Sequence, residues 1–224
     1  MIFRNDDEAF NQTNRRPTIS HKRMNPTTPP PLPQKRGSSN RHNKLIVCLA
    51  LIPAFVIGVL FVLRIFGLIQ PFSVPTEGMS PAISVGDHVM MEGVTYLARE
   101  PHRGDIIVFR TDGIASLPQS QIYVKRVAGE PGDHLRISAG QLYINDKHVV
   151  LSNAVGEIAY NPPPGMGTQP LKTDLTVPDG CYFVLGDNST NSFDSRFWGY
   201  VPRANVKGRI LFCYWPSRRA GRVK

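Results

Sequence analysis

The chain has 224 residues, which is enough for one substantial domain with appendages. Its net charge of +9 comes mainly from residues 1–44, where nine Lys and Arg residues face three acidic ones, whereas residues 65–224 hold sixteen basic and fourteen acidic residues. Because the basic excess is spread along a tail with few aromatic residues, it is typical of a membrane-topology signal, and we expect no nucleic-acid binding.

Residues 1–44 are polar, and residues 26–34 read Pro-Thr-Thr-Pro-Pro-Pro-Leu-Pro-Gln. Such a segment buries too little apolar surface to offset the entropy that it loses on ordering, so we expect a disordered tail on the cytoplasmic side. The proline run is interpreted as a spacer, with a ligand for a polyproline-binding domain as the alternative.

Residues 45–63 are nineteen consecutive residues without a charge. As a helix this run is about 29 Å long, enough to cross the hydrocarbon core, and we predict one transmembrane helix over residues 45–69. A cleaved export signal would be shorter, closer to the N-terminus and followed by small residues, and a buried soluble helix would show a polar face. The basic tail predicts a cytoplasmic N-terminus, with the rest of the chain outside the plasma (inner) membrane and the lipid bilayer as a partner.

Residues 70–224 consist of short β-branched and aromatic runs separated by turn-forming residues. The runs include residues 88–91, 105–109, 122–127, 141–144, 181–185 and 209–214. No long segment of helical periodicity interrupts them, which predicts an extracytoplasmic all-β domain of packed or partly closed, mainly antiparallel sheets. Residues 152–180 are expected to form a long loop.

The three cysteines give a weak signal. Cys48 lies in the apolar run, whereas Cys181 and Cys213 lie in strand-like runs. A disulfide between Cys181 and Cys213 is permitted outside the cytoplasm, but two separate buried thiols are the favoured interpretation. The spacing of Cys and His matches no metal site, and we expect neither a metal nor another cofactor.

Four segments of the β-rich region carry longer motifs. They are residues 74–81 (Val-Pro-Thr-Glu-Gly-Met-Ser-Pro), 103–109 (Arg-Gly-Asp-Ile-Ile-Val-Phe), 123–133 (Tyr-Val-Lys-Arg-Val-Ala-Gly-Glu-Pro-Gly-Asp) and 186–199 (Gly-Asp-Asn-Ser-Thr-Asn-Ser-Phe-Asp-Ser-Arg-Phe-Trp-Gly). In this order, and behind a membrane anchor, they resemble the conserved boxes of type I signal peptidases. Any one box alone would be a weak signal, but together they cover most of residues 72–216.

This resemblance implies a membrane-bound serine endopeptidase that removes signal peptides from exported pre-proteins. In that family a serine attacks the scissile carbonyl and a neutral lysine takes its proton, and Lys125 matches this lysine. A lysine of ordinary pKa, near 10.4, is almost fully protonated at neutral pH, so the role requires burial, which lowers the pKa. The apolar neighbours of Lys125 favour burial over the alternative of a solvated strand lysine.

The same matching implies three supporting roles. Ser192 matches the serine that hydrogen-bonds the lysine amine and orients it. Asp194 and Arg196 match a structural pair, interpreted as an ion pair that fixes the loop. Thr76 matches the hydroxyl donor of the oxyanion hole, whose second donor in the family is the backbone N–H of the nucleophile.

The position of the nucleophilic serine is occupied by Gly78, which keeps the backbone N–H but has no side chain. Thr76 and Ser80 carry the neighbouring hydroxyls, and in extended backbone each would lie about 6.5 Å away along the chain, too far for the lysine without a shift of register. Three interpretations follow: a catalytically silent relative that binds signal peptides or another partner, an enzyme with a displaced nucleophile such as Ser80, or an inactivated copy.

Overall fold

The structure is a computed structural model that describes residues 39–153, 155–162, 164 and 172–223. Most of the predicted disordered tail, residues 1–38, lies outside the described residues, and so does the proline run. The fold is therefore described from the long N-terminal helix onward.

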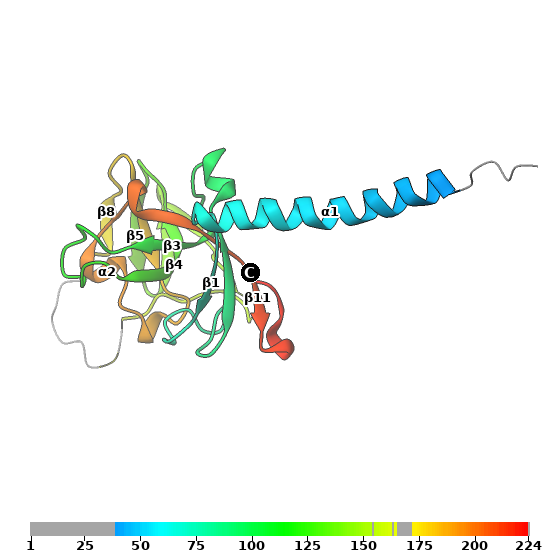
Figure 1. The fold of residues 1–224 in the computed structure, drawn as a ribbon. Coiled ribbons are helices and arrows are strands. Elements are labelled where there is room, and N and C mark those ends of the chain that lie inside the picture. The colour runs from blue at the N-terminus through cyan, green and yellow to red at the C-terminus, as the bar shows by residue number, and fades with distance from the viewer. Residues whose placement is uncertain (1–38, 154, 163, 165–171, 224) are drawn as a thin grey trace, which may run out of the picture. The chain divides into compact units, whose positions relative to one another are not determined.

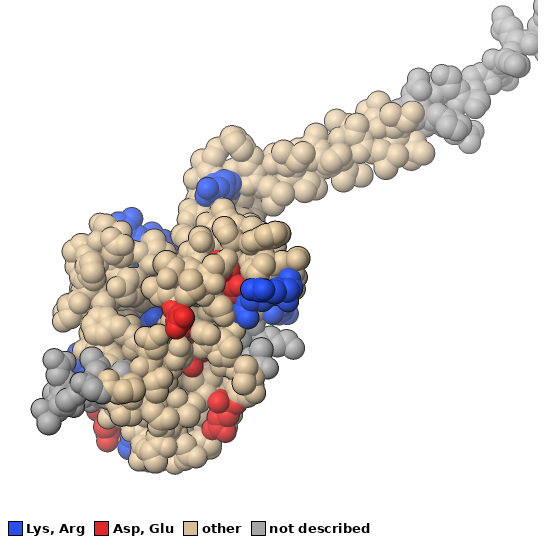
Figure 2. Space-filling view, turned by 90° about the horizontal axis from the view of Figure 1, so that it is seen from below, with Lys and Arg blue, Asp and Glu red and all other residues tan. Residues whose placement is uncertain are grey.

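The helix α1 (Ser39–Ile65) carries the long apolar run. Its apolar side chains, such as Phe55, are exposed in the protein, and Figure 2 shows a helix surface that is almost free of charged side chains. On the face of the β-rich region seen in Figure 2, the charged residues are scattered rather than gathered into one patch. From Lys44 to Ile65 the helix is long and apolar enough to cross a membrane.

The helix ends through a left-handed glycine. Gly67 has a φ of +68°, a conformation that favours a residue without a Cβ. The Leu68 N–H donates to the Leu63 carbonyl (2.8 Å) and the Gly67 N–H to the Arg64 carbonyl (3.1 Å), the two hydrogen bonds of a Schellman motif. This turn stops α1 before the expected limit at residue 69, which already belongs to the first strand.

The β-rich region contains one large antiparallel sheet of eight strands (Figure 1). Its strand order is β1-β2-β11-β3-β4-β9-β10, and β12 pairs with β11. The strands are β1 (Ile69–Ser73), β2 (His88–Glu92), β3 (Ile106–Arg110), β4 (Ile122–Gly129), β9 (Cys181–Leu185), β10 (Val201–Pro202), β11 (Val206–Trp215) and β12 (Gly221–Arg222). Every pairing in this sheet is antiparallel, which confirms the predicted all-β class.

A second antiparallel sheet of four strands has the order β7-β6-β5-β8. Its strands are β5 (His134–Ser138), β6 (Gln141–Ile144), β7 (Lys147–Val149) and β8 (Asp174–Thr176). Strand β8 falls inside residues 152–180, so the prediction that this whole segment is a loop is wrong. The strand has one apolar side chain, Leu175, which packs against the core, and so short a run leaves no alternating pattern to detect in the sequence.

The helical segments of the β-rich region are short. They are η1 (Val94–Leu97), η2 (Ser189–Asn191), α2 (Ser195–Trp198), η3 (Arg203–Asn205) and η4 (Ser217–Arg219). Helix α2 is attached to β9, because the Val184 N–H donates to Ser195 Oγ (2.9 Å). The loop between η2 and α2 contains Ser192, so this contact holds the fourth motif against the large sheet.

Strand β3 lies inside the large sheet and is buried on both faces. Ile107 and Phe109 belong to one apolar cluster, in which the ring of Trp198 lies 6.0 Å from that of Phe109. Val108 belongs to a second cluster on the other face. Since Ile107 is paired directly with Lys125 of β4, the candidate base is carried by a strand that is hydrogen-bonded to this doubly buried one.

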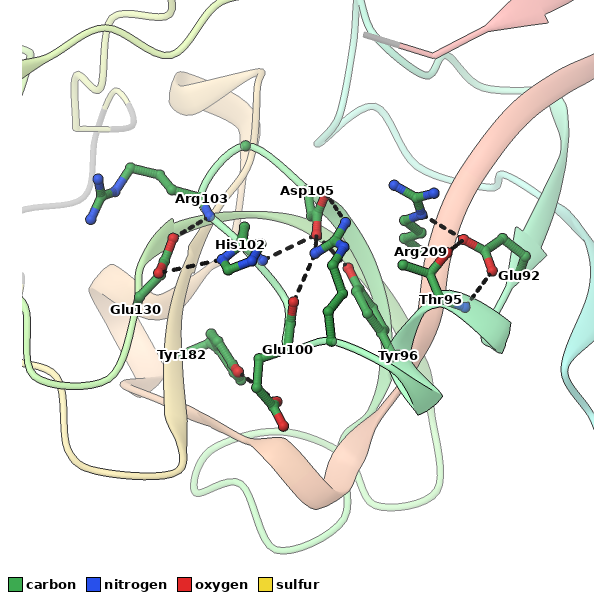
Figure 3. A network of polar contacts seen from close by, with 12 residues as sticks. Glu92, Thr95, Tyr96, Glu100, His102, Arg103, Asp105, Glu130, Tyr182 and Arg209 are labelled. Carbon is green, nitrogen blue, oxygen red and sulfur yellow. Dashed lines mark hydrogen bonds and ion pairs between the residues drawn. The ribbon is translucent and has the colours of Figure 1, made fainter.

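A polar network holds the chain just before β3 (Figure 3). Asp105 accepts hydrogen bonds from Tyr96 Oη (2.9 Å), from Arg99 Nη1 (2.8 Å) and from the His102 N–H (3.1 Å). One carboxylate therefore binds a helical turn, a loop and the start of a central strand together.

The second and third sequence motifs are joined by Arg103. Its backbone N–H donates to Glu130 Oε1 (2.6 Å; Figure 3), and its guanidinium donates to the Ala128 carbonyl (3.0 Å) and to Asp133 Oδ2 (2.5 Å). These contacts fix the turn that follows β4. Much of these two motifs thus stabilises the strand pair that carries Lys125.

Candidate active site

Lys125 lies on β4 with a side chain that is almost fully buried, since the residue is 7% exposed. Burial lowers the pKa of Lys125 below the ordinary lysine value of 10.5, and the carboxylates of Asp194 and Asp187 oppose this shift only in part. Among the residues that the structure describes, Nζ has no hydrogen-bond partner. A buried, unpaired amine with a lowered pKa has the properties of a general base.

Gly78 lies directly beside this amine. A Cβ at Gly78 would be 3.1 Å from Lys125 Nζ, 3.5 Å from the Asn191 carbonyl oxygen and 3.7 Å from Ser192 Oγ. The φ of Gly78 is outside the left-handed range, so its backbone accepts a side chain without strain. The structure thus brings together Lys125, Ser192 and Gly78, which the motifs had singled out.

The segment from Glu77 to Ser80 is a turn and not the extended backbone that the spacing estimate assumed. The Ser80 N–H donates to the Glu77 carbonyl (2.9 Å), so the chain bends immediately after Gly78. Thr76 is exposed and lines the groove described below, whereas Ser80 is not among the groove residues. The assumption of extended backbone through residue 80 is therefore wrong; of the two residues, Thr76 lines the groove beside Gly78 and Ser80 does not.

Ser192 is held at this place by a close approach of backbones. A Cβ on Gly186 would lie 2.1 Å from Ser192 Oγ and 2.4 Å from the Gly78 carbonyl oxygen, so only a glycine fits there. The Gly78 carbonyl also accepts a hydrogen bond from the Asn188 N–H (3.2 Å). Ser192 Oγ is buried and has no partner among the described residues. Its hydrogen-bonding capacity is therefore unmet within the described part of the chain.

Asp194 and Arg196 form the expected ion pair, which is confirmed with Nε and Oδ1 at 2.8 Å and both side chains buried. Arg196 also donates to the Asn161 carbonyl (2.8 Å), to Ser189 Oγ (3.0 Å) and to the Ser189 carbonyl (2.7 Å). The Gly186 N–H donates to the other oxygen of Asp194 (3.0 Å). This pair fixes the loop that carries Ser192.

A second buried ion pair was missed by sequence reasoning. Arg126 Nε donates to Asp187 Oδ1 (2.8 Å), and Arg126 Nη2 donates to Oδ2 (2.6 Å). Burial raises the pKa of Asp187, while Arg126 lowers it. The sequence held one relevant signal. Neighbouring residues of a strand point to opposite faces, so Arg126 and Lys125 are expected on different faces of β4. The pair anchors β4 to the start of the fourth motif.

An open groove of about 910 Å³ runs past Lys125, Gly78 and Ser192. Its apolar lining includes Phe72, Val74, Ile122, Val124, Phe193 and Phe197. Residues 122–125 of β4 pair with β3 only, since the described pairing with β9 begins at Arg126. A strand edge beside an apolar groove can bind an extended peptide through its backbone.

The site contains no group of metal ligands. Within the described ranges, no cluster of three or more His, Cys, Asp and Glu side chains could hold a metal ion. Cys48, Cys181 and Cys213 are unpaired in the structure, with Cys213 buried and Cys181 partly buried. The groups that the site offers are its amine, its hydroxyls and its backbone N–H groups.

The comparison with known proteins agrees with the arrangement of the motifs. The chain belongs to the signal peptidase family, peptidase S26, which matches residues 46–215.

Individual relatives have the same family name. A probable signal peptidase I-2 of Synechocystis is 38% identical over 149 residues, which are 66% of this chain and 64% of that protein. A signal peptidase I of Leptolyngbya laminosa is 37% identical over 153 residues, which are 67% of this chain and 70% of that protein. A solved structure of a signal peptidase I from Enterococcus faecalis is 31% identical, with a TM-score of 0.36, and the match covers 50% of this chain and 97% of that one. The chain thus spans slightly less than two thirds of the Synechocystis protein.

Proposed function

We propose that this chain is a membrane-anchored endopeptidase of the signal peptidase I type, which removes signal peptides from exported pre-proteins with Lys125 as the general base. The observation that carries the proposal is the position of the Lys125 amine, which is buried 3.1 Å from the point where a side chain at Gly78 would begin. A base at this distance reaches any hydroxyl or water held at residue 78. The relatives support the substrate class, since they are named signal peptidases I.

The oxyanion that forms in the reaction would be bound by the segment that contains Thr76 and Gly78. The Gly78 N–H has no hydrogen-bond partner among the described residues, and the Thr76 side chain lines the same groove. Backbone N–H and hydroxyl groups that are free and fixed stabilise the negative charge that develops on a carbonyl oxygen. We assign this role to Gly78 and Thr76.

The groove supports a peptide substrate. An extended segment would pair with residues 122–125 of β4 and place apolar side chains against Phe72 and Ile122. A signal peptide has an apolar segment before its cleavage site, so it has the composition that the groove requires. The helix α1 would serve as the anchor in the plasma membrane, and the excess of Lys and Arg in residues 1–44 favours a cytoplasmic N-terminus.

A second candidate function is binding without cleavage, and Gly78 is the observation that favours it. In a serine protease, loss of the nucleophilic serine lowers turnover on the order of 10⁶-fold. An intact groove with no nucleophile would hold signal peptides or another partner without cutting them.

The test compares the full-length chain in detergent micelles with its Gly78→Ser, Lys125→Met and Lys147→Met variants. Lys147 is an exposed lysine on β7 and serves as the matched control. Each protein is given an exported pre-protein, and the new N-terminus is identified by mass spectrometry. Binding of a fluorescent signal peptide is measured in parallel.

Cleavage at the signal-peptide junction that is lost in Lys125→Met and retained in Lys147→Met would support the peptidase. Binding by the natural chain, with cleavage only in Gly78→Ser, would instead support the second candidate. If no variant cleaves and the signal peptide does not bind, both candidates are wrong.

A further inference from the structure

Glu77 carries an exposed negative charge in the groove. Of the groove residues that the structure describes, only Glu77 and Lys125 are acidic or basic. Lys125 is buried, whereas Glu77 is exposed. When the Lys125 amine is neutral, as the role of a general base requires, the charge of this lining is that of one carboxylate. The groove should therefore attract cations and repel anions at Glu77.

The carboxylate of Glu77 has no cationic partner within the described ranges. It forms no ion pair there and accepts one hydrogen bond, from Asn191 Nδ2 (3.3 Å). Asp187, by contrast, is paired with Arg126 in the same region of the chain's fold. An amide donor leaves the negative charge in place, so Glu77 can still pair with a cation that a ligand brings.

Glu77 lies at the reactive end of the groove. It directly precedes Gly78, so the Cα atoms of these two residues are about 3.8 Å apart. Its hydrogen-bond donor, Asn191, has its carbonyl oxygen 3.5 Å from the place of a Cβ at Gly78. Ile122 of the apolar lining, by contrast, lies three residues before Lys125 on β4, about 10 Å away along an extended strand. The carboxylate is therefore close to the place of the reaction, and this part of the apolar lining is further away.

The order of residues in a signal peptide decides which of them reaches Glu77. Its apolar residues come before the scissile bond, and the proposed function places them along residues 122–124 of β4. Beyond Lys125 this strand edge is closed, because β9 pairs with β4 from Arg126 onward. We therefore place the residues that follow the scissile bond beside Gly78 and Glu77.

We propose that Glu77 recognises a basic side chain in the first two residues after the scissile bond, so that the site favours pre-proteins with Lys or Arg there and disfavours those with Asp or Glu. Phe193 favours a long side chain over a small cation, since it lines the same groove and is 45% exposed. The alkyl part of Lys or Arg packs on such apolar surface while its charged end reaches a carboxylate. This inference rests on the proposed function, because it assumes that a signal peptide lies in the groove.

The test measures binding, so it does not depend on cleavage. Three fluorescent peptides contain the same signal peptide, followed after the scissile bond by Gln-Gln, Lys-Lys or Glu-Glu. A fourth peptide carries Lys-Lys about ten residues further along. All four are titrated at low salt onto the full-length Lys125→Met chain in detergent, which lacks the general base and keeps Glu77 as the charged residue of the described groove lining.

With Glu77 in place, we expect the Lys-Lys peptide to bind about three- to fivefold more tightly than the Gln-Gln peptide, the upper range for an exposed ion pair. The Glu-Glu peptide should bind more weakly by a similar factor, and the displaced Lys-Lys peptide should bind like Gln-Gln. Adding Glu77→Gln removes the charge but keeps an oxygen acceptor for Asn191, so the peptides should bind alike. Glu77→Lys should reverse their order.

Glu157→Gln is the matched control, because Glu157 is exposed and is not among the groove residues. It removes the same charge from another part of the surface and should keep the order of the four peptides. If Glu157→Gln changes this order as Glu77→Gln does, the preference comes from the net charge of the protein, and the inference is overturned.

The remaining outcomes separate this inference from the proposed function. Equal binding of the first three peptides to the chain with Glu77, an order that survives Glu77→Gln, or tight binding of the displaced Lys-Lys peptide would overturn the inference and leave the proposed function standing. A preference of unchanged size at about 1 M salt would also overturn it, because exposed charges are then screened within about 3 Å. If no peptide binds to either the natural chain or Lys125→Met, the proposed function itself is wrong.

Discussion

Two groups of buried polar residues, one around Arg196 and one around Lys125 and Ser192, differ in their hydrogen bonding. Around Arg196 every guanidinium N–H has an acceptor, supplied by Asp194, Ser189 and the Asn161 carbonyl. Around Lys125, neither the amine nor Ser192 Oγ has a partner among the described residues.

We propose that this difference separates polar groups with a structural role from polar groups with a functional role. A buried ion pair with all its hydrogen bonds made holds a loop in one conformation. A buried polar group that lacks a partner destabilises the fold, and a catalytic role is one of the explanations for keeping it. The Arg196 group therefore fixes the loop, and we propose that the group around Lys125 is the one that acts on a substrate.

The largest effect in this comparison is expected from Arg196→Met. The substitution leaves the Asp194 carboxylate buried and unpaired, so the free energy of unfolding should fall by about 3–5 kcal/mol. Arg110→Met is the matched control, since Arg110 pairs with Asp112 on the surface, with the two side chains 44% and 41% exposed. Loss of that exposed pair should change the free energy of unfolding far less, because water and salt screen it. Both values are measured by denaturant unfolding of the full-length chain in detergent, and equal losses would contradict the distinction.

An intermediate loss of unfolding free energy is expected from Gly186→Ala. Gly186 lies between the group around Arg196 and the group around Lys125. The added Cβ would lie 2.4 Å from the Gly78 carbonyl oxygen and 2.1 Å from Ser192 Oγ, and the backbone atom can move only if the strand end moves. Overpacking of this kind costs about 1–3 kcal/mol.

Gly78→Ala is the control for this prediction, because its nearest contact is the flexible end of Lys125 at 3.1 Å. It should change the unfolding free energy by less than Gly186→Ala does. If both alanine variants are equally stable, the close approach at Gly186 does not constrain the site.

The fold class could be predicted from the sequence because alternation and turn signals are local. The run at residues 105–109, for example, largely coincides with β3. Strand β8 was missed because three residues with one apolar side chain carry no period. Strand order was also beyond prediction, because the pairing of β11 with both β2 and β3 joins residues that are far apart in the chain.

The candidate site was predicted only in part. The motifs named Lys125, Gly78 and Ser192, and in the structure a Cβ at residue 78 would lie within 4 Å of the other two. The turn at residues 77–80 was missed because the spacing estimate assumed extended backbone, whereas a hydrogen bond across four residues bends the chain. The pair of Arg126 and Asp187 was missed because the sequence gave no indication that Arg126, directly after Lys125 on the same strand, is buried as well.

The smallest effect, and one of opposite sign, is expected from Lys125→Met. Methionine fills a similar volume without a charge, so the variant should be more stable than the natural chain by about 1 kcal/mol at neutral pH. The pKa of Lys125 is lower in the folded protein than in the unfolded chain. Between the two pKa values the unfolded chain binds more protons, so the stability of the natural chain rises with pH in this range.

The advantage of Lys125→Met should therefore be largest below the folded pKa and should disappear as the pH approaches 10.5, the ordinary lysine value. The measurement is the unfolding free energy of both proteins in detergent between pH 6 and about 10, with Lys147→Met as an exposed control that should show no such trend. A gain that does not depend on pH would mean that Lys125 is not desolvated in the folded state. In that case the amine could not be neutral at the pH of the reaction. The difference in hydrogen bonding between Arg196 and Lys125 would then no longer identify Lys125 as the base.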